Sequence, residues 1–219
     1  MQSRFSEQSL ARLEKTGVIA VLTIDDAQNA VPVADALLAG GVDIMELTLR
    51  TPAALEAVKL VKENRPEMLA GVGTILTEDQ VYLAKEAGAD FGVAPGLNPT
   101  ILQKAQEIDL PFAPGIVTPS EIERAIELGC RELKFFPAEP SGGLKYLKSM
   151  AAPYKHLGLR YMPLGGVSQA NLEDYIASDL ILALGGSWIA PRDLIANHDW
   201  NEISARAVAA TQVVRKYRK

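Results

Sequence analysis

Short apolar runs alternate with longer amphipathic segments along nearly the whole chain. In the amphipathic segments apolar residues recur at helical spacing, and these segments span 7–15, 27–39, 53–63, 78–87, 98–106, 119–128, 144–152, 169–177 and 200–219. The apolar runs have the length of buried strands and span 18–24, 43–49, 68–73, 91–95, 111–116, 132–137, 160–165 and 180–186. The pattern predicts eight strand–helix units with one extra helix before the first strand.

Strands that alternate with helices predict an α/β fold with a parallel sheet. Eight such units in 219 residues favour a closed (β/α)8 barrel, the TIM barrel. The alternative is an open doubly wound sheet, but its glycine fingerprint is missing after the first strand, where the chain reads Thr23-Ile24-Asp25-Asp26. No linker or low-complexity segment interrupts the pattern. We therefore expect one barrel domain over residues 1–219, with the helix at 7–15 closing its N-terminal end.

Composition and charge narrow the classes of function. The net charge is −5, and the one basic run, at residues 215–219, is expected to be a solvated helix end, so nucleic acid is not an expected partner. No apolar run approaches the ~18 residues of a membrane span, and the N-terminus lacks the apolar core of a signal peptide, so we expect no membrane contact and a cytoplasmic location. Cys130 is the single cysteine, and His156 and His198 lie in polar stretches. The chain therefore predicts chemistry by side chains, without a metal or another cofactor.

The second strand places polar residues on the face that points into the barrel. Side chains alternate along a strand, so apolar residues at 45, 47 and 49 face the helices while Glu46, Thr48 and Arg50 point inward. Charged side chains are costly to bury unless they pair or meet a ligand. A Glu46–Arg50 ion pair, or an Arg50 outside the barrel, would explain the row without a function. Because active sites of such barrels occupy the C-terminal ends of the strands, we predict that Glu46 and Arg50 contact a ligand.

The sixth strand carries a lysine between bulky apolar residues. In the segment 132–137, the inward positions are Glu132, Lys134 and Phe136. An apolar environment disfavours the charged form of a lysine, and a neutral amine attacks ketones to form a Schiff base. A buried ion pair of Lys134 with Glu132 or Glu46 is the alternative, and spacing alone does not separate the two interpretations.

The seventh and eighth strands end in glycine pairs, Gly165-Gly166 and Gly185-Gly186, and the second pair is followed by Ser187. Barrel enzymes frequently bind phosphate through backbone N–H groups at these two strand ends. Tight turns would explain each pair alone, but two pairs at these ends favour a phosphate site. The turns Gly73-Thr74 and Pro95-Gly96, at the ends of the third and fourth strands, are further candidate ligand contacts.

Eight short motifs are distributed over the chain. They are Gly-Gly-Val at 40–42, Glu-Leu-Thr-Leu-Arg-Thr at 46–51, Gly-Val-Gly-Thr at 71–74, Ala-Pro-Gly at 94–96, Pro-Gly-Ile at 114–116, Leu-Lys-Phe-Phe-Pro-Ala-Glu at 133–139, Gly-Gly-Val at 165–167 and Gly-Gly-Ser-Trp at 185–188. With them the chain resembles, essentially from end to end, the 2-keto-3-deoxy-6-phosphogluconate (KDPG) aldolases, which also act as 4-hydroxy-2-oxoglutarate aldolases. The lysine motif and the Glu…Arg-Thr motif together are highly specific.

The resemblance implies a homotrimer of barrels that acts on small-molecule keto-acid and aldehyde substrates without a cofactor. It implies Lys134 as the Schiff-base lysine and Glu46 as the general acid and base. The substrate-binding residues that it implies are Arg50, Thr74, Pro95 and Phe136 on the pyruvate side, and Gly165, Gly166, Gly185, Gly186 and Ser187 at the phosphate end.

The implied reaction is cleavage of KDPG to pyruvate and glyceraldehyde 3-phosphate, and the same chemistry would split 4-hydroxy-2-oxoglutarate into pyruvate and glyoxylate. Some relatives carry an arginine where this chain has Thr23, so Arg50 is expected to meet most of the substrate charge. Relatives of the gluconate type commonly have threonine where this chain has Leu164, which leaves the preference between the gluconate and galactonate epimers open. A sugar-phosphate isomerase or epimerase and a non-catalytic phosphate-binding barrel are the alternatives from other classes.

Overall fold

The computed structural model describes residues 3–218. Its strands are β1 (Val18–Leu22), β2 (Ile44–Thr48), β3 (Leu69–Gly73), β4 (Phe91–Val93), β5 (Phe112–Ala113), β6 (Gly115–Ile116), β7 (Glu132–Phe135), β8 (Arg160–Pro163) and β9 (Leu184–Gly186). Its helices are α1 (Glu7–Thr16), η1 (Ala27–Asn29), α2 (Ala30–Ala39), α3 (Ala54–Asn64), α4 (Glu78–Glu86), α5 (Pro99–Glu107), α6 (Pro119–Glu127), α7 (Gly143–Ala151), η2 (Ala152–Leu157), α8 (Leu172–Ile176), α9 (Arg192–Ala196) and α10 (Trp200–Tyr217). The ends of the predicted domain and of the predicted last helix (Met1, Gln2 and Lys219) lie outside the described residues.

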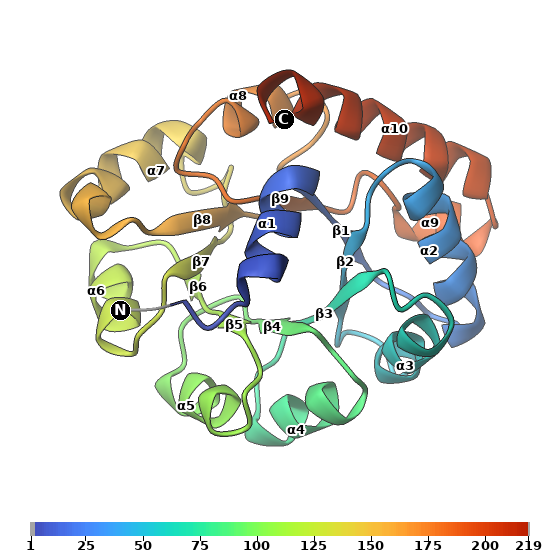
Figure 1. Ribbon diagram of the computed structural model, residues 1–219, viewed down its shortest axis with the longest axis horizontal. Helices are drawn as coiled ribbons and strands as arrows, with labels where there is room; N and C mark the ends of the chain where they lie inside the picture. The colour runs from blue at the N-terminus through green and yellow to red at the C-terminus, as the bar shows by residue number, and fades with distance from the viewer. Residues whose placement is uncertain (1–2, 219) are drawn as a thin grey trace.

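The strands form a parallel barrel with the helices around its outside (Figure 1). One sheet has the order β5-β4-β3-β2-β1-β9 and the other the order β6-β7-β8. Isolated bridges from Tyr161 to Ile181 and from Leu164 to Gly185 join β8 to the segment of β9. On the other side the chain passes directly from β5 to β6 through Pro114. The (β/α)8 fold class predicted from eight strand–helix units is confirmed.

The fifth predicted strand, 111–116, is divided at Pro114 into β5 and β6. β5 pairs with β4, whereas β6 pairs with β7 in a register that sets Gly115 opposite Lys134. Proline has no backbone N–H and cannot donate to a ladder on both sides. Its carbonyl accepts from the Lys134 N–H at 2.9 Å. The strand therefore changes its partner at this residue, and β6 continues beside the part of β7 that carries Lys134.

Apolar side chains fill the interior of the barrel below its C-terminal end. They form one buried cluster, which consists of Phe5, Leu13, Ile19, Ile44, Leu69, Phe91, Val93, Ala113, Met162, Leu164, Leu182 and Ala183. Phe5 and Leu13 enter this cluster from the N-terminal segment and α1, so the extra helix closes the N-terminal end of the barrel as predicted. The barrel is thus a packed core rather than a pore, and a ligand can enter only from the C-terminal end.

Two helices begin where the side chain of the preceding threonine accepts a backbone hydrogen bond. Thr77 accepts from the N–H of Gln80 at the start of α4, and Thr118 accepts from the N–H of Glu121 at the start of α6. In both cases the glutamine or glutamate returns a hydrogen bond to the threonine backbone, which completes a capping box.

The helices near the C-terminus differ from the prediction. The segment predicted at 169–177 is helical only in α8, because Asn171 Oδ1 accepts from the Ser168 N–H at 2.8 Å and holds the preceding residues in a turn. The hydrophobic pattern does not predict α9, since five residues are too few to show helical periodicity.

The basic run at the C-terminus is only partly a solvated helix end. Arg218 donates hydrogen bonds to the carbonyls of Glu14 at 2.8 Å and Ile181 at 2.7 Å, and also to that of Leu182. Burial, and then the charge of Arg160, lowers the pKa of Arg218 to about 10. The expectation of solvation is wrong for Arg218, because Ile181 and Leu182 lie outside a regular strand and their carbonyls accept from a side chain instead.

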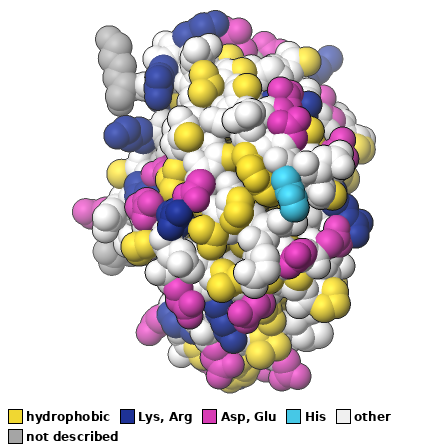
Figure 2. Space-filling model, turned by 90° about the vertical axis from the view of Figure 1, so that its right-hand side faces the viewer, with side chains coloured by type: hydrophobic (Ala, Val, Ile, Leu, Met, Phe, Trp, Pro, Cys, Tyr) yellow, Lys and Arg dark blue, Asp and Glu magenta, His cyan; other side chains and the backbone are white. Residues whose placement is uncertain are grey.

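The surface on the side of α2, α3, α9 and α10 carries basic and acidic side chains interspersed with small apolar areas (Figure 2). This face therefore offers no uniformly basic surface for a nucleic acid. Among residues 3–218, no helix has both the length and the apolar character that a membrane crossing requires.

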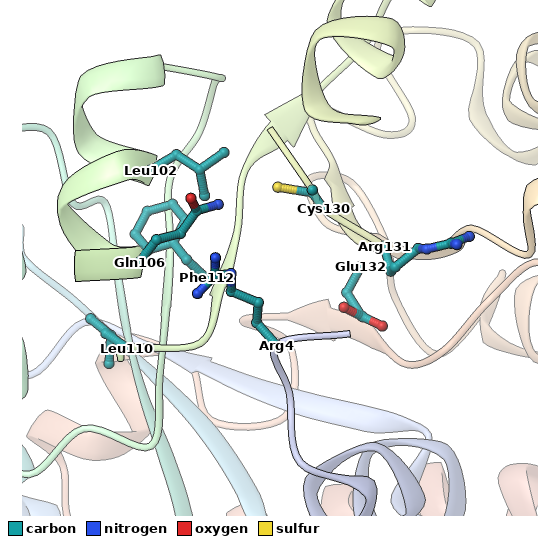
Figure 3. A pocket seen from close by; sticks show the side chains of 9 residues that line it. Arg4, Leu102, Gln106, Leu110, Phe112, Cys130, Arg131 and Glu132 are labelled. Atoms are coloured by element: carbon teal, nitrogen blue, oxygen red, sulfur yellow. The ribbon is translucent and has the colours of Figure 1, made fainter. Parts of the chain in front are cut away.

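The N-terminal end of β7 carries a buried carboxylate. Glu132 is 5% exposed and accepts a hydrogen bond from Ser3 Oγ at 2.9 Å. It borders a small hollow to which Arg4, Phe112 and Cys130 also contribute (Figure 3). Burial raises the pKa of the Glu132 carboxyl, and the Ser3 hydrogen bond opposes this only in part. The hydrogen bond from Ser3 thus links the Glu132 carboxylate to the N-terminal segment.

We expect Glu132→Gln to stabilise the fold at neutral and higher pH. A carboxyl whose pKa is raised by folding contributes stability below its unfolded pKa, and this contribution is lost as the pH rises through the folded pKa. Glutamine is uncharged throughout, so the gain should be absent below the unfolded pKa of about 4 and grow as the pH rises through the raised pKa of the folded protein. Urea unfolding at several pH values measures it, with the exposed Glu56→Gln as control. An equal gain at every pH would contradict the expectation.

Candidate active site

A cleft of about 690 Å³, open to solvent at its mouth, lies at the C-terminal end of the barrel. It is lined by all eleven side chains and glycines that the sequence singles out, which are Glu46, Arg50, Thr74, Pro95, Lys134, Phe136, Gly165, Gly166, Gly185, Gly186 and Ser187. These eleven residues come from β2, β7 and β9 and from the segments that follow β2, β3, β4, β7, β8 and β9, so the C-terminal ends of six strands contribute them to one site.

Lys134 and Glu46 meet at the floor of the cleft. Lys134 Nζ lies 3.2 Å from Glu46 Oε1, and the two side chains are 6% and 2% exposed. The same amine lies 5.5 Å from the centre of the Phe136 ring. Of the two partners that spacing left open for the lysine, Glu46 is the one observed. An amine and a carboxylate at this distance can act as a nucleophile and its proton-transfer partner.

Glu46 reaches the lysine because the neighbouring strand has no side chain in its path. Gly73 lies next to Thr48 in the β2–β3 register. A Cβ atom at Gly73 would overlap Glu46 Oε1 and would lie 2.7 Å from the carboxyl carbon. Any side chain at position 73 would therefore displace the carboxylate. From the sequence, Gly73 was expected to belong to a turn that contacts the ligand, and the room that it leaves for Glu46 was not foreseen.

Arg50 lies at the mouth of the cleft and is exposed. It forms no ion pair with Glu46 and does not lie outside the barrel, so neither of the two alternatives is observed. Its Nε donates to Thr48 Oγ1 at 3.0 Å and its Nη2 to Thr23 Oγ1 at 2.8 Å. Since a guanidinium has five N–H donors, three remain available to an anionic ligand.

Thr74 and Pro95 form another wall of the cleft. Thr74 has a φ of 62°, which is uncommon for a β-branched residue, and such backbone strain concentrates at functional sites. Next to this wall, the backbone of Pro95 occupies the place that a Cβ atom at position 115 would need, so only glycine fits there. The ends of β3, β4 and β6 therefore pack closely, and the backbone itself forms this side of the site.

The turn after β8 exposes free backbone donors to the cleft. Gly165 and Gly166 have φ values of 92° and 82°, in the left-handed region that favours glycine. In the part of the chain that the structure describes, neither N–H donates to another protein atom. Successive free N–H groups of this kind form an anion-binding concavity.

Gly185 and Gly186 are required for a different reason. A Cβ atom on Gly185 would lie 2.7 Å from Leu164 Cγ, and one on Gly186 would overlap the ring of Trp188. Both glycines pair with β1 in the sheet and neither has a positive φ, so close packing rather than a tight turn explains them. Ser187 follows them and is exposed at the mouth of the cleft.

Val21, Thr48 and Val167 also line the cleft without having been predicted to bind substrate, and Leu164 lines it at the position that the sequence linked to epimer preference. Strand alternation was the signal for Thr48, which shares the inward row with Glu46. Over residues 3–218, no three His, Cys, Asp or Glu side chains are grouped as metal ligands. Both histidines are exposed, as their polar surroundings predicted.

Comparison with known proteins identifies related chains over nearly the whole length. The sequence profile described as KDPG and KHG aldolase, in which KHG stands for 4-hydroxy-2-oxoglutarate, matches residues 10–206. The 2-dehydro-3-deoxy-phosphogluconate aldolase of Haemophilus influenzae is 42% identical over 198 residues, which cover 90% of this chain and 92% of the relative.

Two solved structures share the fold closely. The KDPG aldolase of Zymomonas mobilis with 3-phosphoglycerate has a TM-score of 0.89 at 35% identity, covering 98% of this chain and 100% of that one. The KDPG aldolase of Legionella pneumophila, with pyruvate captured as a covalent carbinolamine intermediate, has a TM-score of 0.87 at 35% identity and covers 92% and 97%. With a barrel of this fold, a buried lysine–glutamate pair at its open end and relatives at this identity, the chain belongs to the KDPG and KHG aldolase family.

Proposed function

We propose that this chain is a class I aldolase that cleaves KDPG into pyruvate and glyceraldehyde 3-phosphate through a Schiff base on Lys134. The observation that carries the proposal is the buried contact of 3.2 Å between Lys134 Nζ and Glu46 Oε1 at the floor of the cleft. The related enzymes named above are aldolases, and the Legionella enzyme holds pyruvate as a carbinolamine. Substrates are therefore small keto acids and aldehydes.

The cleft offers a separate place for each charged end of this substrate. Arg50 lies at one side of the Lys134–Glu46 pair with three N–H donors free, which suits the carboxylate next to the ketone. The free N–H groups of Gly165 and Gly166, with the Ser187 hydroxyl, suit the phosphate. The shorter 4-hydroxy-2-oxoglutarate uses the same lysine and Arg50, and its second carboxylate takes the place of the phosphate.

The first half of the reaction forms the imine. The Lys134 amine attacks the C2 ketone, and the oxygen takes up a proton from Glu46 to give a carbinolamine. The nitrogen returns one proton to the Glu46 carboxylate, the hydroxyl leaves as water with that proton, and the protonated imine remains. Phe136 packs at 5.5 Å from the amine and limits the access of other water.

The second half breaks the carbon–carbon bond. Glu46, through water, removes the proton of the C4 hydroxyl, and the electron pair of the C3–C4 bond moves into the imine to form an enamine. C4 becomes the aldehyde carbon of glyceraldehyde 3-phosphate, which leaves. C3 of the enamine then takes a proton, and addition of water at C2 releases pyruvate and restores the amine.

A coupled assay tests this function directly. The purified chain should release pyruvate and glyceraldehyde 3-phosphate from KDPG in equal amounts. An isomerase or epimerase would consume the sugar acid without releasing pyruvate, and a non-catalytic phosphate-binding barrel would bind it without any turnover. Either result would overturn the proposal.

We expect weak selectivity between the gluconate and galactonate epimers, because Leu164 lines the cleft between the lysine and the glycine turn. Its side chain is 5% exposed and packs against Gly185, so it can give no hydrogen bond to the C4 hydroxyl. A net hydrogen bond contributes roughly 0.5–1.5 kcal/mol, which is about tenfold in selectivity at most. Leu164→Thr should raise the preference for the gluconate epimer by up to that factor, measured as kcat/KM for both. Strong gluconate selectivity that the substitution leaves unchanged would show that another residue reads C4.

The proposal includes a homotrimer located in the cytoplasm. Three large apolar side chains are exposed at α4 and the turn before it, with 54% of Leu76, 43% of Tyr82 and 44% of Leu83 accessible. Exposed apolar groups of this size favour burial against another chain. The single cysteine, Cys130, is free and buried, which suits a reducing compartment. Sedimentation equilibrium of the purified chain tests the assembly, and a monomer at assay concentrations would remove the trimer from the proposal.

A further inference from the structure

A hydrogen-bonded group of two threonines holds the guanidinium of Arg50. Thr48 Oγ1 accepts from Arg50 Nε at 3.0 Å and donates to the Leu22 carbonyl at 2.8 Å. Thr23 Oγ1 accepts from Arg50 Nη2 at 2.8 Å and lies 3.3 Å from Thr48 Oγ1. Thr48 is 3% exposed, whereas Arg50 is exposed to solvent. A solvent-exposed arginine is therefore anchored by groups on β2 and at the end of β1.

The direction of each hydrogen bond follows from the proton count. A hydroxyl has one proton, and Thr48 donates its proton to the Leu22 carbonyl. In the contact between the two threonines, Thr23 must therefore be the donor. The lone pairs of the Thr23 hydroxyl are then left to accept from Arg50. The hydrogen bonds therefore run in one direction, from Arg50 through Thr23 and Thr48 to the backbone of β1.

We propose that Thr23 is a positioning residue that holds the Arg50 guanidinium in the orientation that binds the substrate carboxylate. The inference rests on the proposed function, because it assigns Arg50 to that carboxylate. A long exposed side chain samples many rotamers, and a ligand that binds it must restrict them. Thr23 and Thr48 impose this restriction in the free protein, and they leave both protons of Nη1 and one of Nη2 for a planar carboxylate.

The space beside the cleft gives Arg50 room to move in a protein that lacks the Thr23 hydroxyl. A second hollow of about 690 Å³, open to solvent, adjoins the cleft, and both are lined by Val21, Arg50 and Ser187. Thr23 lines only the second hollow. Without the Thr23 hydroxyl, the guanidinium is held on one side by Thr48 alone and has room to turn away from the lysine.

The test compares Thr23→Val, which keeps the shape and removes the hydroxyl, with Thr23→Ser, which keeps the hydroxyl. Carboxylate binding contributes to the ground state and the transition state alike, so its loss raises KM and leaves kcat nearly unchanged. We expect Thr23→Val to raise the KM for KDPG roughly 5- to 10-fold and to change kcat by less than about 3-fold. Thr23→Ser should restore KM to within about 2-fold. Thr51→Val is the matched control, since Thr51 donates to the Ile24 carbonyl in the same region.

A double-mutant cycle separates positioning from a purely structural role. If Thr23 acts through Arg50, Thr23→Val should raise KM no further in an Arg50→Gln background. Equal effects in both backgrounds, or an unchanged KM in Thr23→Val, would overturn the inference while the proposed function stands. Failure of the unmodified chain to cleave KDPG would overturn the proposed function instead. Should Thr23→Val not fold, Thr23→Ala is measured in the same cycle.

Discussion

We expect Lys134→Arg to abolish both imine trapping and cleavage. Borohydride with pyruvate should attach a carboxyethyl group to the unmodified chain on the peptide that contains Lys134, because the reduced imine is a stable secondary amine. A guanidinium stays protonated and cannot form this imine. The loss of turnover should be on the order of 10⁴-fold or more, as for the removal of a covalent nucleophile in other enzymes. Peptide mass mapping and the pyruvate assay measure the two effects.

Lys62→Arg is the matched control for this experiment. Lys62 is also ion-paired and partly buried, with Nζ 2.8 Å from Asp90, but it lies outside the cleft. Its replacement should leave trapping and cleavage unchanged. Borohydride modification found only on another lysine, or cleavage retained in Lys134→Arg, would show that the nucleophile was assigned to the wrong residue.

The second large effect is expected for Glu46→Gln. Glutamine keeps the shape of the side chain and can still contact Lys134 Nζ, but it cannot transfer protons. General acid–base catalysis typically contributes ~10²–10⁴-fold, so turnover should fall within that range. Pyruvate should still be trapped, only more slowly, because the amine itself is unchanged. Steady-state cleavage and the time course of borohydride trapping distinguish the two steps.

Two further variants test whether the position of the carboxylate matters. Gly73→Ala keeps every functional side chain, yet its Cβ occupies the place of Glu46 Oε1, so turnover should also fall. Glu132→Gln removes the other buried barrel carboxylate, at the opposite end of β7, and should leave turnover unchanged. Normal turnover in Glu46→Gln would show that water or another group moves the protons.

The fold and most of the cleft follow from patterns that are local in the sequence. Alternation along the strand predicted the inward row of Glu46 and Arg50, and the flanking apolar residues marked Lys134. The predictions that were wrong concern features that depend on a partner far away in the sequence. The fifth strand divides because Pro114 meets two different neighbours, and Arg218 is partly buried because the carbonyls of Ile181 and Leu182 need donors.

By itself, the sequence determined the barrel class, the closing N-terminal helix and the residues that face the open end, since periodicity and strand alternation depend only on the order of side chains. Only the tertiary structure decided that Lys134 pairs with Glu46 and not with Glu132. β2 and β7 belong to different sheets, so their side chains meet only when the barrel closes. Pairing of β2 with its two neighbours in the same sheet brings Gly73 of β3 beside the carboxylate and Thr23 at the end of β1 beside Arg50. Distances between side chains on separate strands are set by packing of the whole barrel, which no local pattern encodes.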